Sequence, residues 1–395
     1  MRVLHVIPSV SESSGGPSKA IVQIEQSLLA RGVEVVTVTT NDDGNGKLLP
    51  VELEKINPHN GVNRIYFPMQ VHAYKISMPM RRWLLKEIRN FDLVHVHAVF
   101  SFAPVMAALI ARKNNIPYVI RPLGVLNHYG MTKRRSLFKK ISLGFFEAKL
   151  LRDAAAIHFT SDQERIEAES LGIKLRSVVL PLGIEPANAQ SGDLMLTEFP
   201  MLKNRRCLLY LSRIDPKKNI EALLEALLVC KKEVPDIALI ICGDGDKNYI
   251  SELKMLAVKL NIADCVVWPG HVSGTMKASA FGTAELFVLP SYSENFGIAP
   301  VEALSVGLPC VLGEGVAVAS RVAEVGAGLS VAPTSVAVAQ GILSFMLHPD
   351  ALANAAIQAK KLALSDYGVN TMGDRLFDLY NGLTATRIPA RKSAV

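Results

Sequence analysis

The chain has 395 residues, of which 49% are hydrophobic and 20% charged, a composition typical of a folded globular protein rather than a disordered one. This length is more than one hydrophobic core usually supports, so we expect at least two domains. The longest apolar stretch, Ala98 to Ala111, is interrupted by Ser101 and Pro104 and is shorter than the ~18 residues that a membrane span needs. The N-terminal apolar run contains His5 and Pro8, which is unlike a signal peptide, so we expect the protein to stay in the cytoplasm.

Charge and cysteine content narrow the class further. The net charge is +7, and the excess lies in residues 1–185, which hold 24 Lys and Arg against 16 Asp and Glu, whereas the remainder holds 19 against 20. The cysteines form no CxxC pair, so we expect reduced, buried thiols and predict neither a disulfide framework nor a zinc site. They are Cys207, Cys230, Cys242, Cys265 and Cys310.

The first half of the chain alternates strands and helices. A β-rich run at residues 3–7 precedes a glycine-rich turn, a helical pattern from Ser18 to Ala30 that stops at Gly32, and a second strand at residues 33–39. Strand–helix–strand units of this kind build parallel sheets. Further predicted elements are strands at 93–97, 117–120, 154–159 and 177–180, a helix ending at Lys113 and a helix at 162–171.

The second half repeats this alternation after residues 185–206, whose Pro, Asn, Ser and Gly content is typical of an interdomain connection. The predicted strands are 207–211, 237–242, 266–268, 286–289 and 309–312, and the predicted helices are 220–232, 247–260 and 298–306. Two doubly wound α/β domains are therefore predicted. In such sheets ligands bind at the carboxyl ends of the strands, so we expect the functional residues in the loops there.

The most informative stretch is SYSENFGIAPVEALSVGLPCV, residues 291–311. A buried strand ends just before it, a loop contains Glu294 and Gly297, and a helix begins near Pro300, so the backbone N–H groups of the helix N-terminus could bind a phosphate. Glu294 and Glu302 could accept hydrogen bonds from sugar hydroxyls. Local physics also permits a solvated loop glutamate and a glutamate that only stabilises the helix dipole.

Glu294, seven intervening residues and Glu302, framed by FVLPSYSENFG and EALSVGLPCV, resemble the E-x7-E signature of the retaining glycosyltransferases of family four, which have the GT-B fold. The resemblance implies that Glu294 holds hydroxyls of the donor sugar and that Glu302 holds the ribose of the nucleotide. It also implies that the loop and helix start contact the sugar and diphosphate through Asn295, Phe296, Gly297 and Ile298.

A second match is LSRIDPKKN, residues 211–219, which resembles the family's G-R-x-x-x-x-K-G loop with serine and asparagine in place of the two glycines. Arg213 and Lys218 could converge on one diphosphate and neutralise it as it leaves, without a divalent metal. Lys217 competes with Lys218 for this role, and only the spacing favours Lys218. The alternative is a solvated basic loop before a helix.

The strand that ends at Cys242 leads into Gly243-Asp244-Gly245-Asp246. The two aspartates imitate the DxD metal motif of the other large glycosyltransferase fold, but their placement matches the family's Gly-x-Gly loop beside the nucleotide. Gly243 is therefore a predicted donor contact, and we predict neither a metal nor another cofactor. His271 lies where family members contact the base, although a lone histidine is more often structural.

In the first half, Gly15 and Gly16 follow the first strand and resemble the glycine loop that approaches the donor phosphates. The chain has no GxGxxG and no GxxxxGK[ST], which argues against a dinucleotide dehydrogenase and a P-loop NTPase. The segment DLVHVH resembles the family's D-V-V-H-A-H, which implies that His97 contacts the donor sugar. His95 lies on the same side of the strand and is predicted to be packed.

The sequence offers fewer matches for residues that border the acceptor. Arg121, in RPLG, resembles part of a P-R-G-M segment that borders the acceptor, with order and residues altered, and His128 is assigned to the acceptor with it. Leu182 stands where the family's P-N-G loop has asparagine. The basic run 133–152 has apolar residues at roughly helical spacing, which fits a peripheral contact with an anionic membrane and equally a core helix with a solvated face. Nucleic-acid binding is not predicted, because no recognition motif accompanies the charge.

The resemblance implies two Rossmann-like, doubly wound parallel-sheet domains that face each other across a cleft. These are an acceptor domain at 1–190, a donor domain at 191–370, and a helix and tail at 371–395 that cross back to the first domain. The implied reaction moves a hexose, glucose favoured, from a nucleotide diphosphate sugar, UDP favoured, to a glycan or lipid-linked glycan in surface or exopolysaccharide synthesis. The anomeric configuration is retained. The alternatives are a catalytically silent nucleotide-sugar-binding subunit of a polysaccharide assembly complex and a sugar-nucleotide 2-epimerase.

Overall fold

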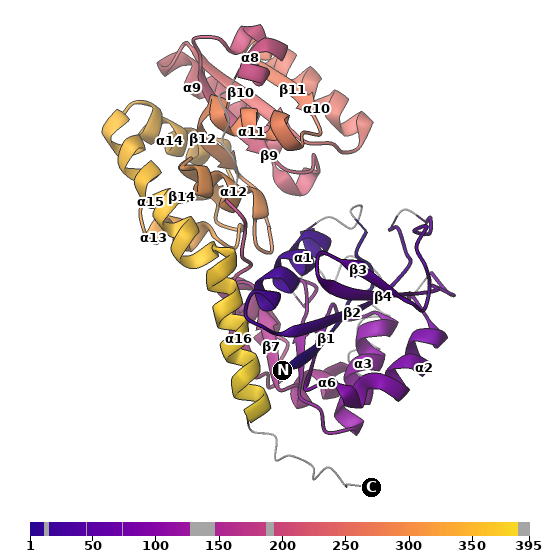
Figure 1. The fold of residues 1–395 in the computed structure, drawn as a ribbon. Coiled ribbons are helices and arrows are strands. Elements are labelled where there is room, and N and C mark those ends of the chain that lie inside the picture. Colours follow the sequence, from indigo (N-terminus) through magenta and orange to yellow (C-terminus); the bar gives the residue numbers. More distant parts are fainter. Residues whose placement is uncertain (12–15, 45, 73, 127–146, 187–192, 386–395) are drawn as a thin grey trace, which may run out of the picture. The chain divides into compact units, whose positions relative to one another are not determined.

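The computed structural model describes residues 1–11, 16–44, 46–72, 74–126, 147–186 and 193–385. The chain divides into two compact units, the first made of residues 1–183 and 369–395 and the second of residues 184–368 (Figure 1). The boundaries predicted from the sequence, 190 and 370, fall a few residues after these divisions. Each unit contains one sheet flanked by helices, so the predicted fold class of two doubly wound α/β domains is confirmed.

The first unit has an eight-stranded sheet in the order β3-β4-β2-β1-β5-β6-β7-β8. Its strands are β1 (Arg2–Val6), β2 (Glu34–Thr40), β3 (Ile56–His59), β4 (Val62–Phe67), β5 (Leu93–His97), β6 (Tyr118–Arg121), β7 (Ala156–Phe159) and β8 (Ser177–Val179). Neighbouring strands pair in parallel, except that β3 runs antiparallel to β4. This hairpin was not predicted. Asn60 and Gly61 connect it at φ values of 49° and 84°, as a tight two-residue hairpin turn requires.

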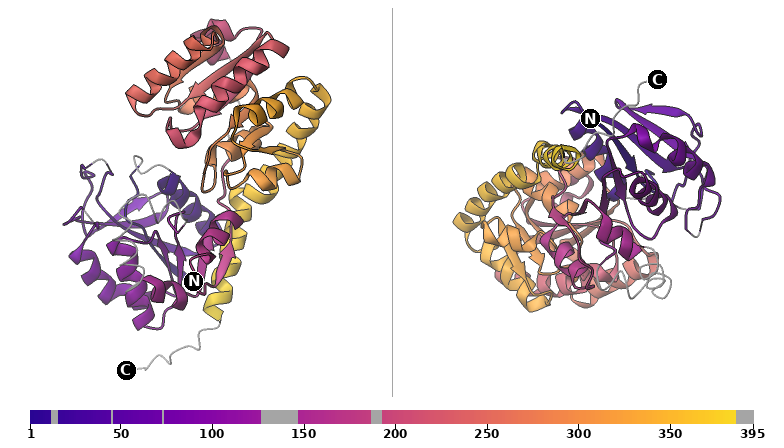
Figure 2. Two further views of the ribbon diagram at one scale, coloured as in Figure 1. Left: turned by 180° about the vertical axis from the view of Figure 1, so that it is seen from behind. Right: turned by 90° about the horizontal axis from the view of Figure 1, so that it is seen from below.

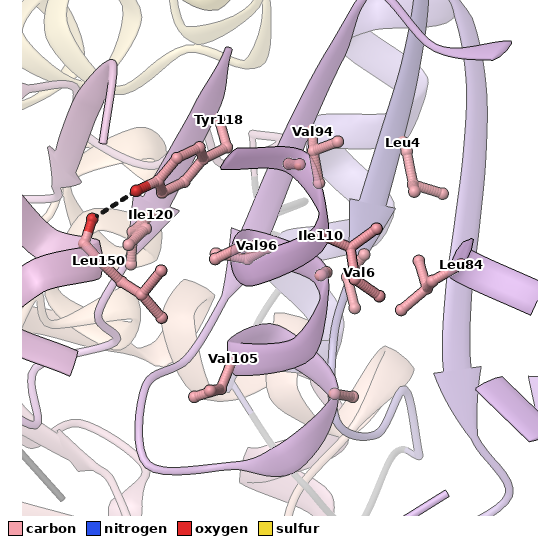
Figure 3. Packing of buried hydrophobic residues seen from close by; sticks show 14 of the residues in the cluster. Leu4, Val6, Leu84, Val94, Val96, Val105, Ile110, Tyr118, Ile120 and Leu150 are labelled. Atoms are coloured by element: carbon pink, nitrogen blue, oxygen red, sulfur yellow. Dashed lines mark hydrogen bonds between the residues drawn. The ribbon is translucent and has the colours of Figure 1, made fainter. Parts of the chain in front are cut away.

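Helices cover both faces of this sheet. They are α1 (Gly16–Leu29), α2 (Met78–Glu87), α3 (Phe102–Lys113), α6 (Ala148–Asp153), α7 (Asp162–Glu169) and α16 (Val369–Ala385), and a 3-10 turn, Ile88–Asn90, follows α2. One face, built by alternate residues such as Val6, Val94 and Val96, packs against α2, α3 and α6 (Figure 3). The Tyr118 hydroxyl donates to the Leu150 carbonyl at 2.8 Å, so the phenol of this core residue is satisfied.

The opposite face lies under α1 and α16, which contact each other (yellow α16 in Figure 2). The Arg31 guanidinium at the end of α1 lies 2.8 Å from the Asp374 carboxylate and donates to the Asn370 carbonyl at 2.7 Å. The predicted last helix therefore exists and packs on the first unit. Beneath α1, the buried Glu25 carboxylate pairs with Arg64 of β4 at 2.5 Å and accepts from Thr37 of β2 at 2.6 Å.

The second unit has a six-stranded, all-parallel sheet in the order β11-β10-β9-β12-β13-β14. Its strands are β9 (Arg206–Leu211), β10 (Ile237–Cys242), β11 (Val266–Gly270), β12 (Ala284–Leu289), β13 (Cys310–Gly313) and β14 (Gly328–Val331). Its helices are α8 (Asp193–Glu198), α9 (Ile220–Glu233), α10 (Lys247–Lys259), α11 (Gly274–Thr283), α12 (Ile298–Val306), α13 (Ala319–Glu324), α14 (Ser335–Met346) and α15 (Pro349–Tyr367). Helices α9 and α14 pack together, as do α12 and α15.

The prediction that residues 185–206 are only a connection is wrong for their described part. They contain α8 and a 3-10 turn, Pro200–Leu202, and α8 packs against α11. Met195 is fully buried, and its N–H donates to the Ser279 hydroxyl at 2.8 Å. Burial of Met195 against α11 removes apolar surface from water and helps to hold this short helix in place.

The five cysteines are free and buried, as predicted. Burial raises the pKa of Cys207 to about 11, which keeps that sulfur a thiol. Within the described residues, no single helix is long and apolar enough to cross a membrane. Helices α14 and α15 meet the length and hydropathy criteria only together, and the pair is bent by 97° at the break between them.

Candidate functional site

In the second unit, the loop after β9 places the predicted cations at the carboxyl end of the sheet. Asp215 caps a 3-10 turn, Pro216–Lys218, by accepting from the Lys217 N–H at 2.9 Å. Arg213 is exposed, whereas Lys218 is only 4% exposed. The turn thus directs Lys218 inward and leaves Arg213 at the surface, while Lys217, the rival of Lys218, is only partly covered.

Asn219 explains how this loop departs from the family pattern without changing shape. The residue has φ 57° and ψ 47°, in the left-handed region that glycine favours and asparagine tolerates. Its side-chain amide donates to the carbonyls of Pro290 and Pro333 at 3.2 and 2.8 Å. The asparagine therefore keeps the turn and ties it to the end of β12.

The loop between β12 and α12 holds Glu294. Its backbone is fixed by the loop after β13, because the Glu294 N–H donates to Gly315 at 2.9 Å and its carbonyl accepts from Ala317 at 3.0 Å. Gly297, at φ 92°, caps α12, which begins at Ile298 as predicted. The Phe296 ring is buried edge-on against Tyr367, with ring centroids 5.7 Å apart, so a ligand contact by this residue would have to come from its backbone. Asn295 is exposed.

Lys218 and Glu294 form a direct ion pair between Nζ and Oε2. The lysine side chain is 6% exposed and the glutamate side chain 27%. Burial, reinforced by the charges of Lys217 and Arg213, lowers the pKa of Lys218 to about 8, and the Asp215 carboxylate opposes this shift in part. Two of the predicted catalytic residues from different strands therefore meet at one point, and Arg213 adds positive potential there.

Glu302, the second carboxylate of the motif, lies on α12 and pairs with a residue that the sequence motifs did not identify. Lys277 of α11 donates from Nζ to Glu302 Oε1 at 2.6 Å. Both side chains are largely covered, at 21% and 15% exposure. No short motif links residues 25 positions apart on different helices, and the sequence contained no local pattern that could have found the pair.

The loop after β10 has a structural reason for its glycines. A Cβ on Gly243 would lie 1.9 Å from the Ser212 carbonyl oxygen, and one on Gly245 would lie 2.0 Å from that of Ile214. Asp246 caps α10 by accepting from two backbone N–H groups at 3.0 Å, and Asp244 accepts from the Gly245 N–H at 2.8 Å. Both carboxylates thus serve the local backbone, which disfavours the DxD metal interpretation. Donor contacts by Gly243 and by the exposed His271 stay predictions.

In the first unit, His97 belongs to a row of buried histidines across the carboxyl ends of the strands. His97 Nε2 lies 2.8 Å from His5 Nδ1, and His95 Nδ1 lies 2.6 Å from the Tyr380 hydroxyl of α16. His158 bonds the Leu180 carbonyl at 2.8 Å. Burial lowers the pKa of His5 and His158 to about 3 and that of His95 and His97 well below its usual range, so all four rings are neutral at pH 7. The prediction that His95 is packed is confirmed.

Arg121 adjoins this row, paired in register with His97 across β5 and β6. The residue is 3% exposed, and burial lowers the pKa of its guanidinium to about 10, so the group remains cationic at neutral pH. Its Nε and Nη1 atoms have no hydrogen-bond partner among the described residues. The acceptor role predicted for Arg121 requires a ligand that reaches this covered group.

The imidazoles of His5, His95 and His97 offer nitrogen atoms within 4.8 Å of one another, and neutral imidazole is a common metal ligand. The buried guanidinium of Arg121, however, lies beside the cluster, in register with His97. A divalent ion would be repelled by the same charge. The chemistry of the cluster therefore suits a polar network better than a metal centre.

Three predictions fall partly or wholly outside the described residues. Gly15 and His128 lie there, whereas Gly16 begins α1. Of the basic run 133–152, only the end is described, as part of α6. In that part Lys149 and Arg152 are exposed and Leu150 and Leu151 are buried, which is the pattern of a core helix with a solvated basic face.

Two doubly wound sheets, with the motif-matched cation and carboxylate residues at the strand ends of the second, are the architecture of a GT-B glycosyltransferase. Sequence comparison agrees: the family model "Glycosyl transferases group 1" matches residues 198–362, and the "Glycosyl transferase 4-like domain" matches residues 15–183. The chain belongs to this family of glycosyltransferases.

Curated relatives include the phosphatidyl-myo-inositol mannosyltransferase of Mycobacterium leprae, 27% identical over 96% of each chain. The alpha-monoglucosyldiacylglycerol synthase of Streptococcus pneumoniae is 29% identical over a matched region that covers 56% of this chain and 52% of that relative. Among solved structures, Anabaena HepE in complex with UDP has a TM-score of 0.78 at 19% identity, over 97% of this chain and 100% of that one. Sucrose-phosphate synthase from Thermosynechococcus elongatus has a TM-score of 0.75 at 18% identity, over 98% and 100%.

Proposed function

We propose that this glycosyltransferase moves a hexose, with glucose favoured, from a uridine diphosphate sugar to a glycan or lipid-linked glycan acceptor, with retention of the anomeric configuration. The observation that supports this best is the meeting of Lys218 and Glu294 at the carboxyl ends of β9 and β12, beside the N-terminus of α12. A buried ammonium next to a partly exposed carboxylate matches a sugar attached to a diphosphate, which has hydroxyl donors at one end and anionic oxygens at the other.

The choice of donor and acceptor rests on relatives. HepE structures contain UDP, UDP with glucose, and UDP-glucose, and the streptococcal relative is named for a glucosyl lipid. The mycobacterial relative is named for mannose and a phosphatidylinositol acceptor, so a mannosyl donor is the competing choice. Both names favour an acceptor attached to a lipid. We therefore infer an acceptor presented at a membrane surface, with the enzyme in the cytoplasm and in peripheral contact with that surface.

In the proposed reaction the bond between the sugar C1 and the diphosphate oxygen breaks, and a bond from C1 to the acceptor oxygen forms on the same face. The acceptor proton passes to the leaving phosphate oxygen. Lys218 and Arg213 stabilise the negative charge that develops on that diphosphate, and fixed side-chain cations make a divalent metal unnecessary. Glu294 holds the sugar through its hydroxyls and is not a nucleophile. Catalysis is then mainly positioning and electrostatic stabilisation.

The test is transfer of labelled glucose from UDP-glucose by EDTA-treated enzyme, with a bacterial lipid extract as acceptor. We expect activity to survive EDTA and to fall by at least ~100-fold in Lys218→Met, the scale seen when one transition-state donor is removed. The matched control is Lys231→Met, which removes a lysine in the last turn of α9 that pairs with the exposed Asp264, and which should keep wild-type activity. Loss of activity in EDTA that magnesium restores, or wild-type rates in Lys218→Met, would contradict the proposal.

A further inference from the structure

Each carboxylate of the E-x7-E motif faces a lysine, and the second lysine has no assigned role. Glu294 pairs with Lys218, and Glu302 pairs with Lys277 at 2.6 Å. Lys277 lies near the start of α11, on a different helix from its partner. Its ammonium is also 5.8 Å from the centre of the Phe281 ring, one turn further along α11, and Phe281 is 2% exposed. The lysine is thus supported by a fixed aromatic ring.

The burial of the carboxylate distinguishes this pair from the Lys231–Asp264 ion pair of the same unit. Glu302 is 15% exposed and Asp264 is 60% exposed, whereas the two lysines are similarly covered, at 21% and 26% exposure. An exposed pair adds little and opens readily, because water replaces either partner. A carboxylate that is mostly withdrawn from water depends on its counter-charge, so the Glu302 side chain is held in one orientation.

The two oxygens of Glu302 have different surroundings. Oε1 accepts a hydrogen bond from Lys277, and the described residues supply no hydrogen bond to Oε2. A carboxylate held in this way presents one oxygen as a fixed acceptor, which suits a vicinal diol such as the 2′- and 3′-hydroxyls of ribose. We propose that Lys277 is a positioning residue that orients Glu302 for the ribose of the nucleotide. This inference rests on the proposed function, since it presupposes a nucleoside diphosphate donor.

The alternative is that Lys277 only holds α11 and α12 together. The two roles are distinguished by comparing ligands with and without the ribose hydroxyls. The variants are Lys277→Met, which keeps the length of the side chain and removes its charge, and Lys277→Arg, which restores the charge. Lys231→Met is the control, because it removes a similarly covered lysine of the same unit whose carboxylate partner, Asp264, is exposed. Thermal unfolding of each variant establishes that it is folded before any binding is measured.

Calorimetric titration with UDP and with 2′,3′-dideoxyuridine diphosphate then tests the role. We expect Lys277→Met to weaken UDP binding roughly tenfold, the effect of one hydrogen bond to a charged group, and to change dideoxy-UDP binding by less than about twofold. Lys277→Arg should recover most of the UDP affinity, and Lys231→Met should match the wild type. In transfer assays Lys277→Met should raise the donor KM and leave kcat nearly unchanged, because the ribose does not change during reaction.

Equal losses for UDP and dideoxy-UDP would show a structural tie and overturn the inference, as would wild-type affinity of Lys277→Met for UDP. Failure of the proposed function would be seen in the wild-type protein instead. If the wild-type protein binds neither UDP nor GDP, the donor assignment fails and the role of Lys277 falls with it. If it binds GDP in place of UDP, the same comparison is made with GDP and its dideoxy analogue.

Discussion

The Lys218–Glu294 pair predicts an asymmetry between its two single variants. Glu294→Gln removes the carboxylate charge and leaves the ammonium, whereas Lys218→Met removes the ammonium and leaves the carboxylate. The two remaining charges have different access to water, because the Lys218 side chain is 6% exposed and the Glu294 side chain 27%. Glu294→Gln should therefore destabilise the second unit more than Lys218→Met does.

The magnitudes follow from this exposure. A carboxylate at 27% exposure can be solvated when its partner is lost, so Lys218→Met should lower the free energy of unfolding by about 1 kcal/mol. An ammonium at 6% exposure, with Arg213 and Lys217 acting on it, cannot be solvated in this way, so Glu294→Gln should lower the free energy of unfolding by about 3 kcal/mol. The difference between the variants should be about 2 kcal/mol.

Urea unfolding followed by tryptophan fluorescence measures this difference in the correct unit. The chain has two tryptophans, Trp83 in the first unit and Trp268 in the second, so a Trp83→Phe background makes the fluorescence report the second unit alone. The deficit of Glu294→Gln should shrink as the pH rises above about 8, where Lys218 loses its proton in the folded state before it does so in the unfolded state. Equal destabilisation by both variants, or a larger loss in Lys218→Met, would refute the argument.

Three further predictions concern titration and the histidine row. The value of kcat/KM for the donor should fall as the pH rises through about 8, because the free enzyme then loses the Lys218 proton. The value of kcat should fall less, because the bound diphosphate stabilises the protonated lysine. A pH profile of kcat/KM that stays flat up to about pH 9.5 would contradict this prediction. Tyr380→Phe removes the hydroxyl that bonds His95 at 2.6 Å and should destabilise the first unit by about 2 kcal/mol, measured by Trp83 fluorescence in a Trp268→Phe background. Burial raises the pKa of Glu147 to about 7, so its proton is bound more tightly in the folded state, and the free energy of unfolding should decrease by about 3 kcal/mol between pH 4.5 and 7 relative to Glu147→Gln; parallel pH curves for the two proteins would show the group to be solvated.

Local patterns in the sequence were sufficient to predict the elements around the second-unit site. The helix at 298–306 and the strand at 237–242 have the predicted bounds. The strand is a continuous apolar run that ends at Gly243, and the helix lies between two glycines, Gly297 and Gly307, whose positive φ values suit helix ends. Asn219 was recognised as a departure from the family pattern, and its left-handed backbone shows why the departure leaves the loop unchanged. The β3–β4 hairpin was also predictable from a local pattern, because Asn60-Gly61 is a typical two-residue hairpin turn.

The features that could not be predicted depend on contacts between distant segments. Lys277 meets Glu302 only because α11 and α12 bring them together, and the burial of Met195 depends on the packing of α8 against α11. The partner of His97 is His5, on a strand whose histidine belonged to no recognised motif. Spacing along the chain specifies which residues share a loop, but the sheet order decides which loops meet.

The central claim is that the second unit binds a nucleoside diphosphate sugar at Lys218 and Glu294 without a metal. The most direct test is thermal unfolding of the EDTA-treated protein in the presence of UDP, GDP, ADP and TDP and their common sugar conjugates. A ligand at 100 times its Kd stabilises the folded state by about 2.7 kcal/mol, which is readily measured. We predict a clear response to one nucleotide, UDP first, that is lost in Lys218→Met and kept in Lys231→Met; no response to any nucleotide in the wild-type protein would contradict the claim.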